Sequence, residues 1–298
     1  MAQLNIVRSY HSFLILEKAL SDNTVEAYMS DLEKLMAYAL DGGFVIERAC
    51  YADLQGFLKS LSLSGVSNAT VVRIVSSVKS FYRYLVFEGV MKEDPSLLLE
   101  SPKVGRHLPD VLSVEEIDKI LASIDMSKAE GQRNRAILET LYGCGLRVSE
   151  LLNLQLTDIF RKEGVIRVIG KGNKERLVPI SKVALKEIDL YAAEERTRLK
   201  IKPGYEDFVF LNRRGAQLTR VMIFTIIKNA VAISGVKKNV SPHTFRHSFA
   251  THLLENGANL RVIQEMLGHA SITTTEVYAH LNSKMLSDTV EKYHPRAK

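Results

Sequence analysis

Three prolines interrupt the chain between residues 93 and 112 and divide it into two parts. Pro95, Pro102 and Pro109 lie in this stretch, and the segment SPKVGRHLPD within it follows neither a helical nor a strand period. Proline lacks the backbone N–H that regular elements need, so no helix or strand is expected to run through the segment. The sequence therefore predicts one domain over residues 1–100, a linker over 101–112 and a second domain over 113–298. A length of 298 residues is sufficient for two domains of ordinary size.

The first hundred residues follow helical periods. Asn23 and Glu26 match the polar pair that caps a helix start, and Gly42-Gly43 follows the apolar face that comes next. A longer helix is predicted from about Asn68 to Phe87 because its apolar residues recur every three or four positions. Further helices are expected near 4–20 and 51–62. The first part is therefore predicted to be a small all-α domain.

Basic side chains lie off the apolar stripe of the helix predicted at 68–87. Arg73, Lys79 and Arg83 are interspersed there with serines, whose short hydroxyls let a phosphate backbone approach. These three residues are candidates for DNA binding. The alternative is an ordinary solvated helix face.

The second part is predicted to be a mixed α/β domain, mainly helical with a small antiparallel sheet. VIRVIG (165–170) and ERLVPI (175–180) are β-rich runs joined by a short turn, so they predict a hairpin with Lys171 at its tip. Residues 208–211 predict one further strand or hairpin. Ser113 with Glu116 forms a capping box that begins the domain. Helices are expected near 181–199, 219–234, 242–256, 259–267 and 273–282.

The overall charge favours an anionic partner. The chain has a net charge of +6, and residues 106–298 hold 30 Lys and Arg against 22 Asp and Glu, whereas residues 1–105 hold 10 against 12. No apolar run approaches the ~20 residues of a membrane span, and the N-terminus lacks the pattern of a secretory signal. Cys50 and Cys144 form no metal or redox motif and suit a reducing compartment. These features predict a cytoplasmic protein without a membrane partner.

Six polar residues of the second part stand at predicted element ends or turns and form a candidate catalytic set. Arginines, a lysine, imidazoles and a phenol make a poor metal site but a good site for one phosphate and one covalent nucleophile. This combination predicts breakage and rejoining of a nucleic-acid backbone without a metal or other cofactor. The six residues are Arg147, Lys171, His243, Arg246, His269 and Tyr278.

Each type of side chain has a role in such a reaction. Two guanidinium groups can stabilise the negative charge that develops on the phosphate oxygens. A lysine can protonate the leaving alkoxide, and a histidine can accept the proton of the attacking phenol. His243 and Arg246 are three residues apart near a helix start marked by Ser241-Pro242, so they share one face there.

A zinc site is the competing interpretation of the histidines. His243 and His247 are spaced like two zinc ligands on a helix, but Thr244 occupies the position at which a zinc protease has glutamate. We therefore expect no metal, and we expect His247 and His252 to be structural or supporting residues.

The chain resembles the tyrosine recombinase (phage-integrase-like) family, and most closely its Xer branch. The resemblance rests on GCGLRVSELLNL, VIGKGNKERLVPI and SPHTFRHSFATHLLENGANLRVIQEMLGHASITTTEVYAH, together with the helical N-terminal part. It implies that Arg147, Lys171, His243, Arg246 and His269 are catalytic and that Tyr278 is the nucleophile. It also implies that Glu150 supports the first arginine and that the N-terminal domain is a SAM-like DNA-binding domain.

The family resemblance also implies the partners. The two domains are expected to hold double-stranded DNA between them, and four protomers to assemble on two paired recombination sites. The C-terminal segment, about 283–298, is expected to pack onto a neighbouring protomer. The sequence leaves open whether all protomers are identical or include a paralogous recombinase, and whether a DNA translocase activates them. It also leaves open chromosome-dimer resolution, a step of chromosome partition in cell division, against integration or excision of a mobile element.

Two other functions are compatible with parts of this pattern. A type IB topoisomerase-like enzyme uses the same chemistry but rejoins the original strand. A DNA-binding regulator without catalysis would have no need for the nucleophile Tyr278. The N-terminal helical domain and the candidate exchange segment favour recombination.

Overall fold

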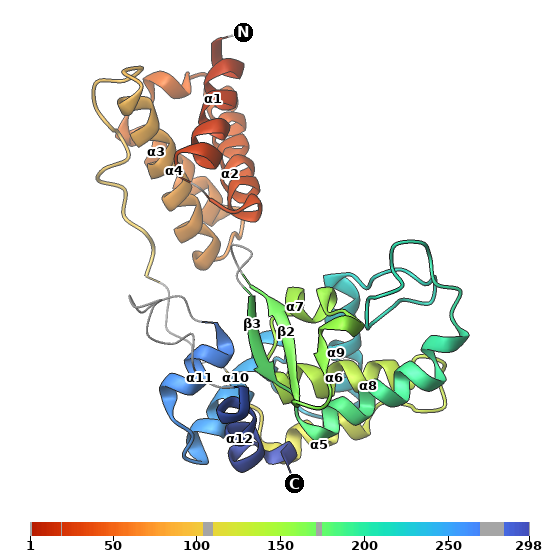
Figure 1. Cartoon of the computed structure of the whole chain (residues 1–298). Coiled ribbons are helices and arrows are strands. Elements are labelled where there is room, and N and C mark those ends of the chain that lie inside the picture. Colours follow the sequence, from red (N-terminus) through yellow and green to blue (C-terminus); the bar gives the residue numbers. More distant parts are fainter. Residues whose placement is uncertain (1, 19, 104–109, 171–174, 269–282, 298) are drawn as a thin grey trace. The chain divides into compact units, whose positions relative to one another are not determined.

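The computed structural model describes residues 2–18, 20–103, 110–170, 175–268 and 283–297, and it omits the side chains of residues 2–5, 283–285 and 297. The chain forms two compact units, Met1–His107 and Leu108–Lys298 (Figure 1). Each has its own hydrophobic core. The sequence-based fold class is confirmed, because the units are mostly helical and a small antiparallel sheet lies in the second. Within the described residues, no helix is both long and apolar enough to span a bilayer.

The described residues of the N-terminal unit form four α-helices and one short 3₁₀ helix. The core between them is aromatic-rich and includes Tyr10, Phe57 and Phe81, each buried. The elements are α1 (Ala2–Leu16), α2 (Asp22–Asp41), η1 (Ile46–Arg48), α3 (Tyr51–Leu63) and α4 (Asn68–Phe87).

Helix α4 has the bounds that the sequence predicts. The Ser67 hydroxyl accepts a hydrogen bond from the Thr70 N–H at 3.4 Å and caps the helix start. The prediction for α2 is wrong at its start, because the helix begins at Asp22 and Asn23 and Glu26 lie inside it. Ser21 adopts the extended conformation of an N-cap residue, and Asp22 puts a negative charge in the first turn, where the helix dipole favours it.

The second unit surrounds one continuous core with eight α-helices among the described residues. Helix α6 packs against both α8 and α10, and α5 packs against α9. The helices are α5 (Val114–Ala122), α6 (Gly131–Cys144), α7 (Val148–Asn153), α8 (Lys182–Glu194), α9 (Arg220–Ser234), α10 (Pro242–Glu255), α11 (Leu260–Leu267) and α12 (Ser283–Tyr293); the short 3₁₀ helices include η2 (Leu156–Asp158), η4 (Arg196–Arg198) and η5 (Pro295–Ala297).

The sheet has the strand order β1-β2-β3 and is antiparallel throughout: β1 (Ile159–Phe160), β2 (Val165–Ile169), β3 (Glu175–Pro179). The hairpin of β2 and β3 is confirmed, with Val168 opposite Arg176 and Ile169 opposite Glu175. Its tip, including Lys171, lies outside the described residues. Figure 1 shows α11 and α12 beside β3, which both helices contact.

The further strand or hairpin predicted at residues 208–211 is realised only as isolated antiparallel bridges, one of them between Leu211 and Gln217 across a turn. Phe208 and Leu211 each make one isolated bridge, and the described part of the chain forms its third strand at Ile159–Phe160 instead. The apolar run is explained by burial, because Val209, Phe210 and Leu211 are all inside the core. Their backbone uses other partners there, such as the Tyr191 hydroxyl, which accepts from the Leu211 N–H at 3.2 Å.

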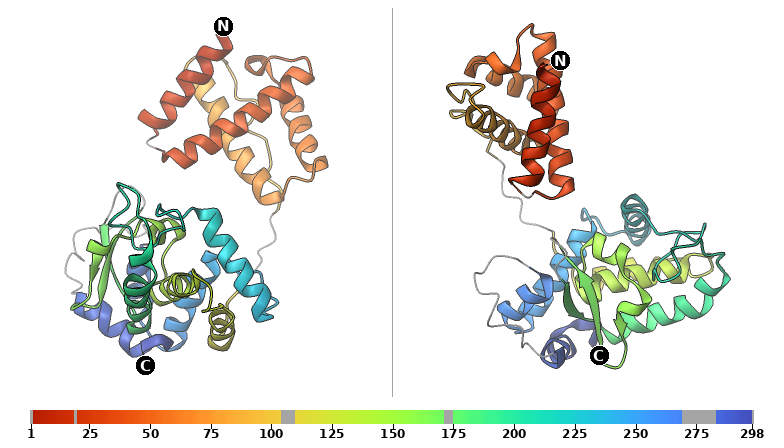
Figure 2. Two further views of the ribbon diagram at one scale, coloured as in Figure 1. Left: turned by 90° about the vertical axis from the view of Figure 1, so that its right-hand side faces the viewer. Right: turned by 45° about the horizontal axis from the view of Figure 1, so that its top comes forward.

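The C-terminal helix α12 packs on its own unit, against α10 and β3 (Figure 2). Leu286 and Val290 are buried in the core of the second unit. Lys182 of α8 forms an ion pair with Glu291 at 2.5 Å. Residues 283–297, expected to be exchanged between protomers, are therefore docked within one chain here, and their exchange stays a prediction.

Candidate active site

Arg147 stands at the start of α7, as its place in the sequence predicts. Gly145 ends α6 in the left-handed conformation with φ 60°, and a Cβ there would lie 2.5 Å from the ring of Phe249. Glycine is therefore required at this turn for both conformation and space. The turn delivers Arg147 as the extended N-cap residue of α7, with its side chain 33% exposed.

The buried carboxylate of Glu150 holds Arg147 twice. The Arg147 backbone N–H donates to Oε2 at 2.8 Å, and the guanidinium Nη1 donates to Oε1 at 2.8 Å. Because Glu150 sits three residues into the helix, it satisfies a free N–H of the first turn and orients the arginine side chain at the same time. Glu150 thus holds Arg147 in place, and its support of a catalytic arginine stays a prediction.

Arg246 reaches the same place from α10. That helix begins with the predicted Ser241-Pro242 cap, in which the Ser241 hydroxyl accepts from the Thr244 N–H. The Arg246 side chain is 9% exposed, and its Nη1 donates to the carbonyl of Gly145 at 2.8 Å and lies 3.8 Å from Oε2 of Glu150. Burial and the neighbouring charge of Arg147 lower the pKa of Arg246 to about 10, so the group remains cationic at neutral pH.

A third arginine, Arg176 of β3, completes the cluster and was not among the residues selected from the sequence. Its Nη1 and Nη2 donate to the two oxygens of Glu150 at 2.8 and 3.0 Å, and its Nε donates to the carbonyl of Met266 at 2.9 Å. The available signal was strand alternation, because Arg176 is two residues before the buried Val178 and so shares its face. A charged residue on the core face of a strand needs a partner inside.

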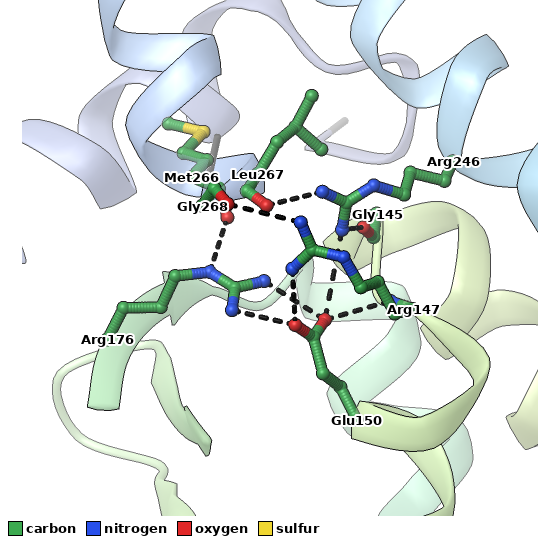
Figure 3. A network of polar contacts seen from close by, with 8 residues as sticks. All are labelled: Gly145, Arg147, Glu150, Arg176, Arg246, Met266, Leu267 and Gly268. Carbon is green, nitrogen blue, oxygen red and sulfur yellow. Dashed lines mark hydrogen bonds and ion pairs between the residues drawn. The ribbon is translucent and has the colours of Figure 1, made fainter. Parts of the chain in front are cut away.

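The three guanidinium groups also bind the last carbonyls of α11 (Figure 3). Arg176 binds that of Met266, Arg246 that of Leu267, and Arg147 that of Gly268 at 3.1 Å. A helix C-terminus leaves its last carbonyls without partners and carries partial negative charge, so cations stabilise it.

The cluster carries an excess of positive charge. Three guanidinium groups share the single carboxylate of Glu150 among the described residues drawn in Figure 3. Burial alone would raise the pKa of the Glu150 carboxyl, but the hydrogen bonds and charge of Arg176, aided by Arg147, outweigh burial and keep that pKa below its usual value. The carboxylate therefore stays ionised, and the remaining positive charge favours an anion such as a phosphate.

Comparison with protein families agrees with this arginine-lined site. A model described as "Phage integrase family" matches residues 110–285, and one described as "Phage integrase, N-terminal SAM-like domain" matches residues 7–89. The chain belongs to the phage integrase family of tyrosine recombinases. It is 44% identical over 293 residues to the tyrosine recombinase XerD of Oceanobacillus iheyensis, and the match covers 98% of each protein. The resemblance to the Xer branch is thereby confirmed.

Solved structures of relatives share the fold. The XerH site-specific recombinase bound to difH substrate in a pre-cleavage complex matches with a TM-score of 0.66 and 26% identity, over 83% of this chain and 74% of that one. The Tn1549 transposon integrase in complex with circular intermediate DNA matches with a TM-score of 0.72 over 90% of this chain and 92% of that one, and its 21% identity supports the fold alone. Together with the family match and the near-complete match to XerD, these findings show that the chain is a site-specific DNA recombinase.

Of the four other candidate catalytic residues, the structure describes one, His243. His243 is exposed in the first turn of α10, three residues before Arg246 and on the same face. Lys171, His269 and Tyr278 lie outside the described residues. His269 directly follows Gly268, whose carbonyl is bound by Arg147.

His252 of α10 has a clear assignment. Nδ1 of His252 lies 2.8 Å from the Tyr142 hydroxyl inside the core, so His252 has a structural role, as expected. Across the described ranges, no three His, Cys, Asp or Glu side chains form a group that could hold a metal ion.

The three basic residues of α4 differ in their surroundings. Arg73 forms an ion pair with Asp31, a carboxylate with no exposed surface, and also donates to the carbonyl of Ala27 at 3.3 Å. Lys79 donates to the carbonyl of Leu97 at 3.3 Å, whereas Arg83 is exposed. Arg73 therefore neutralises a buried charge of its own unit, and phosphate contact by all three residues stays a prediction.

Proposed function

We propose that this recombinase cleaves one strand at a time by attack of Tyr278 on a phosphodiester held by Arg147 and Arg246. The observation that carries the proposal is the convergence of both guanidinium groups on Glu150, which leaves a local excess of positive charge. A phosphodiester brings one negative charge and gains more as the transition state forms. Two planar guanidinium groups can stabilise that charge without a metal ion, and each is expected to contribute about 10²–10³ in rate.

The reaction proceeds by transesterification. The phenol of Tyr278 loses its proton to His243 or His269, its oxygen bonds to phosphorus, and the bond from phosphorus to the 5′ oxygen breaks. Lys171 gives a proton to the leaving 5′ oxygen, which produces a 3′-phosphotyrosyl link and a free 5′-hydroxyl. The 5′-hydroxyl of a partner duplex then attacks that link and restores the tyrosine. One ester replaces another in each step, so ATP is not needed.

Binding of α11 at the arginine cluster supports a role for His269. The carbonyls of Leu267, the last residue of α11, and of Gly268, its C-cap, are held by Arg246 and Arg147, the two side chains that would hold the phosphate. His269 directly follows Gly268 in the chain, and Gly268 is held by Arg147, which supports a role for His269 in the reaction.

For assembly, we propose that four protomers act on two paired sites in double-stranded DNA, each releasing residues 283–298 to a neighbour. The contacts of α12 with β3 and α10 define the surface that would accept the segment of another copy. The near-complete match to relatives named XerD favours chromosome-dimer resolution in the cytoplasm over integration or excision of a mobile element. A paralogous recombinase in the tetramer and activation by a DNA translocase are further options within this assembly.

Covalent capture tests the nucleophile. Full-length protein is incubated with fragmented genomic DNA of the organism that encodes it, and the ends joined to protein are sequenced to identify the site and cut position. A suicide duplex of that site should then trap the wild-type enzyme, while Tyr278→Phe should bind the same duplex and form no adduct. An adduct that persists in Tyr278→Phe would show that another residue is the nucleophile.

Plasmids carrying one or two copies of the captured site test recombination itself. Two directly repeated sites on a plasmid should be resolved into two circles, and one site should give no such product. Efficient relaxation of any supercoiled plasmid, without a product that depends on paired sites, would identify a topoisomerase instead.

A further inference from the structure

Arg176 lies in the same cluster as the two candidate phosphate-binding arginines but has a different set of contacts. A guanidinium group presents two edges with paired donors. In Arg176 the Nη1–Nη2 edge is fully occupied by the two oxygens of Glu150, and the other edge is engaged through Nε by the carbonyl of Met266. Neither edge is left for a bidentate contact with phosphate.

Arg147 differs in this respect. It gives Nη1 to Glu150 and Nη2 to Gly268, and its side chain is 33% exposed, compared with 15% for that of Arg176. Arg147 therefore keeps its Nε for a substrate. Arg246, although more buried, does so as well, because its bonds to Gly145 and Leu267 use only Nη1 and Nη2, whereas all three nitrogens of Arg176 donate to protein acceptors.

Glu150 depends on Arg176 more than on its other partners. Arg176 provides both charge-assisted hydrogen bonds of the bidentate pair, which is the strongest geometry between a guanidinium and a carboxylate. The orientation of that carboxylate in turn sets the backbone and the side chain of Arg147, which donate to its two oxygens. Removal of Arg176 would free the carboxylate to rotate.

Arg176 also ties strand β3 to the end of α11. Its Nε bonds to Met266, and a Cβ built on Gly268 would lie 3.1 Å from that same nitrogen. The guanidinium therefore packs directly against the turn that precedes His269.

We propose that Arg176 is a positioning residue for strand cleavage: it fixes Glu150 and the end of α11, and so sets where Arg147 lies, without contacting the phosphate. This inference rests on the proposed function. Lysine should replace Arg176 poorly, because a single ammonium cannot bond both carboxylate oxygens and the Met266 carbonyl in the same way.

The test compares Arg176→Met and Arg176→Lys with wild type and with Arg167→Met. Arg167 is a matched control, because it is an arginine of the neighbouring strand β2 whose Nε and Nη2 bond Asp158 at 2.9 and 2.8 Å, outside the arginine cluster. Two quantities are measured: the affinity for an uncleaved site, and the rate of covalent capture at saturating enzyme. Arg176→Met should bind DNA within about threefold of wild type but cleave it roughly 10–100-fold more slowly. The cleavage rate of Arg176→Lys should lie between those of wild type and Arg176→Met, and that of Arg167→Met should be near wild type.

A double-mutant cycle with Glu150→Gln separates positioning from direct contact with phosphate. If Arg176 acts through Glu150, Arg176→Met should cost less than about threefold on the Glu150→Gln background, because the carboxylate it orients is already gone. An equal loss on both backgrounds would overturn the proposal and indicate direct contact with the substrate.

The pH profile gives a readout that general loss of structure would not move. Within the part of the chain that the structure describes, Arg147, Arg176 and Arg246 are the charged groups that face Glu150. Arg176 counteracts the rise in the pKa of Glu150 that burial causes, so without Arg176 this carboxyl should take up a proton more readily. As the pH falls from about 8 to about 5, the capture rate of Arg176→Met should therefore decrease more steeply than that of wild type. Parallel profiles would contradict this role.

Control measurements separate the inference from the proposed function. Failure of wild-type protein to form any adduct would remove the proposed function itself. If wild type and Arg176→Met formed the covalent adduct at the same rate, only the proposed role of Arg176 would be excluded. If Arg176→Met does not fold, Arg176→Lys is tested in its place. A capture rate and a pH profile of Arg176→Lys equal to those of wild type would then overturn the proposal.

Discussion

The guanidinium Nη2 of Arg147 donates a hydrogen bond to the carbonyl of Gly268 at 3.1 Å, and this contact joins segments 121 residues apart in the chain. It links the start of α7 to the end of α11. Gly268 adopts the left-handed conformation with φ 64°, which presents its carbonyl to the arginine cluster as α11 ends. The turn at Gly268 is therefore part of the active-site architecture.

Gly268→Ala should slow strand cleavage more than it destabilises the protein. The left-handed conformation costs an alanine about 1 kcal/mol, and the added Cβ would also press on Arg176 at 3.1–3.2 Å. We expect covalent capture to slow by roughly tenfold, because misplaced catalytic groups lose rate steeply. Gly235→Ala is the control: Gly235 ends α9 at φ 74° with nothing within 4 Å of its Cβ position, so it should lose similar stability and keep its rate. Equal rates for the two variants would contradict the prediction.

Arg147→Ala and Arg246→Ala should reduce the cleavage rate alike but differ in stability. Each removes a donor for the developing charge, so capture should slow by about 10²–10³ in both. Arg246 is buried and bonds the carbonyls of Gly145 and Leu267, so its loss should cost about 2–4 kcal/mol of unfolding free energy. Arg147 is partly exposed, so water can replace its contact and the loss should be about 1 kcal/mol. Urea unfolding measures both, and a larger loss for Arg147→Ala would be the contrary result.

Much of this site could be predicted from the sequence because its signals are local. The Ser241-Pro242 cap marks the start of α10 and so puts His243 and Arg246 on one face, and Gly145 marks the turn before Arg147. The proximity of Arg147 and Arg246 depends on tertiary packing, because the two residues are far apart in the chain and local sequence periodicity gives no information about it. It was predicted through the family resemblance, and the structure brings both onto Glu150.

Other features depend on tertiary packing and escaped prediction. Arg176 appears from the sequence as an ordinary hairpin arginine, and only the folded structure brings its two acceptors, Met266 of α11 and Glu150 of α7, within reach. Residues 208–211 resemble a strand in the sequence because a short apolar run is typical both of a buried strand and of any other buried segment. In the structure Val209, Phe210 and Leu211 are buried without belonging to a strand. The C-terminal residues appear from the sequence as a loose tail. Only the folded structure shows that Leu286 and Val290 are buried in the core of the second unit.

Arg73→Ala and Arg83→Ala should separate structural from DNA-binding roles on α4. Asp31 is fully buried and accepts from Arg73, from Lys34 at 3.2 Å and from Ser77 at 3.1 Å. Loss of Arg73 should therefore cost about 1–3 kcal/mol of unfolding free energy. Arg83 is exposed, so Arg83→Ala should change stability by less than about 0.5 kcal/mol but reduce the salt slope of DNA binding by about 1. An unchanged salt slope in Arg83→Ala would exclude Arg83 as a phosphate contact.

Acid should destabilise the catalytic unit through His294. Its ring is buried, with centroids 4.7 Å from that of Tyr142 and 5.2 Å from that of Phe249, and burial lowers the pKa of His294 to about 3. The unfolded chain takes up this proton near pH 6.5 and the folded chain does not, so the stability is present above about pH 6.5 and declines as pH falls toward 3. The slope should approach about 1.4 kcal/mol per pH unit.

His294→Phe should flatten this dependence, since phenylalanine keeps the ring packing and cannot titrate. Buried His252, whose pKa is also lowered by burial, should leave a smaller residual slope. Thermal unfolding from about pH 7 to about pH 4 measures both proteins. Superimposable curves would show that His294 is already accessible to protons in the folded state.

Arg296→Met should loosen the docked C-terminal segment. Arg296 pairs with Asp118 at 2.5 Å and with Glu139, which is 2% exposed. The Arg296 Nε and Glu139 Oε2 atoms lie 3.2 Å apart but without hydrogen-bond alignment, so their attraction is one of charge. Removing the cation leaves a buried carboxylate that burial already makes easier to protonate, at a cost of about 2–4 kcal/mol.

Lys182→Met provides the matched control, because it breaks the exposed pair with Glu291 of α12 in the same C-terminal segment and should cost less than about 0.5 kcal/mol. Limited proteolysis should cut Arg296→Met near α12 well before the control. If the segment re-forms this anchor on a neighbouring protomer, Arg296→Met should also lose two-site recombination more than single-site covalent capture, since only the former requires assembly. Equal losses in the two assays would place the effect of Arg296 within one protomer and argue against exchange of the segment.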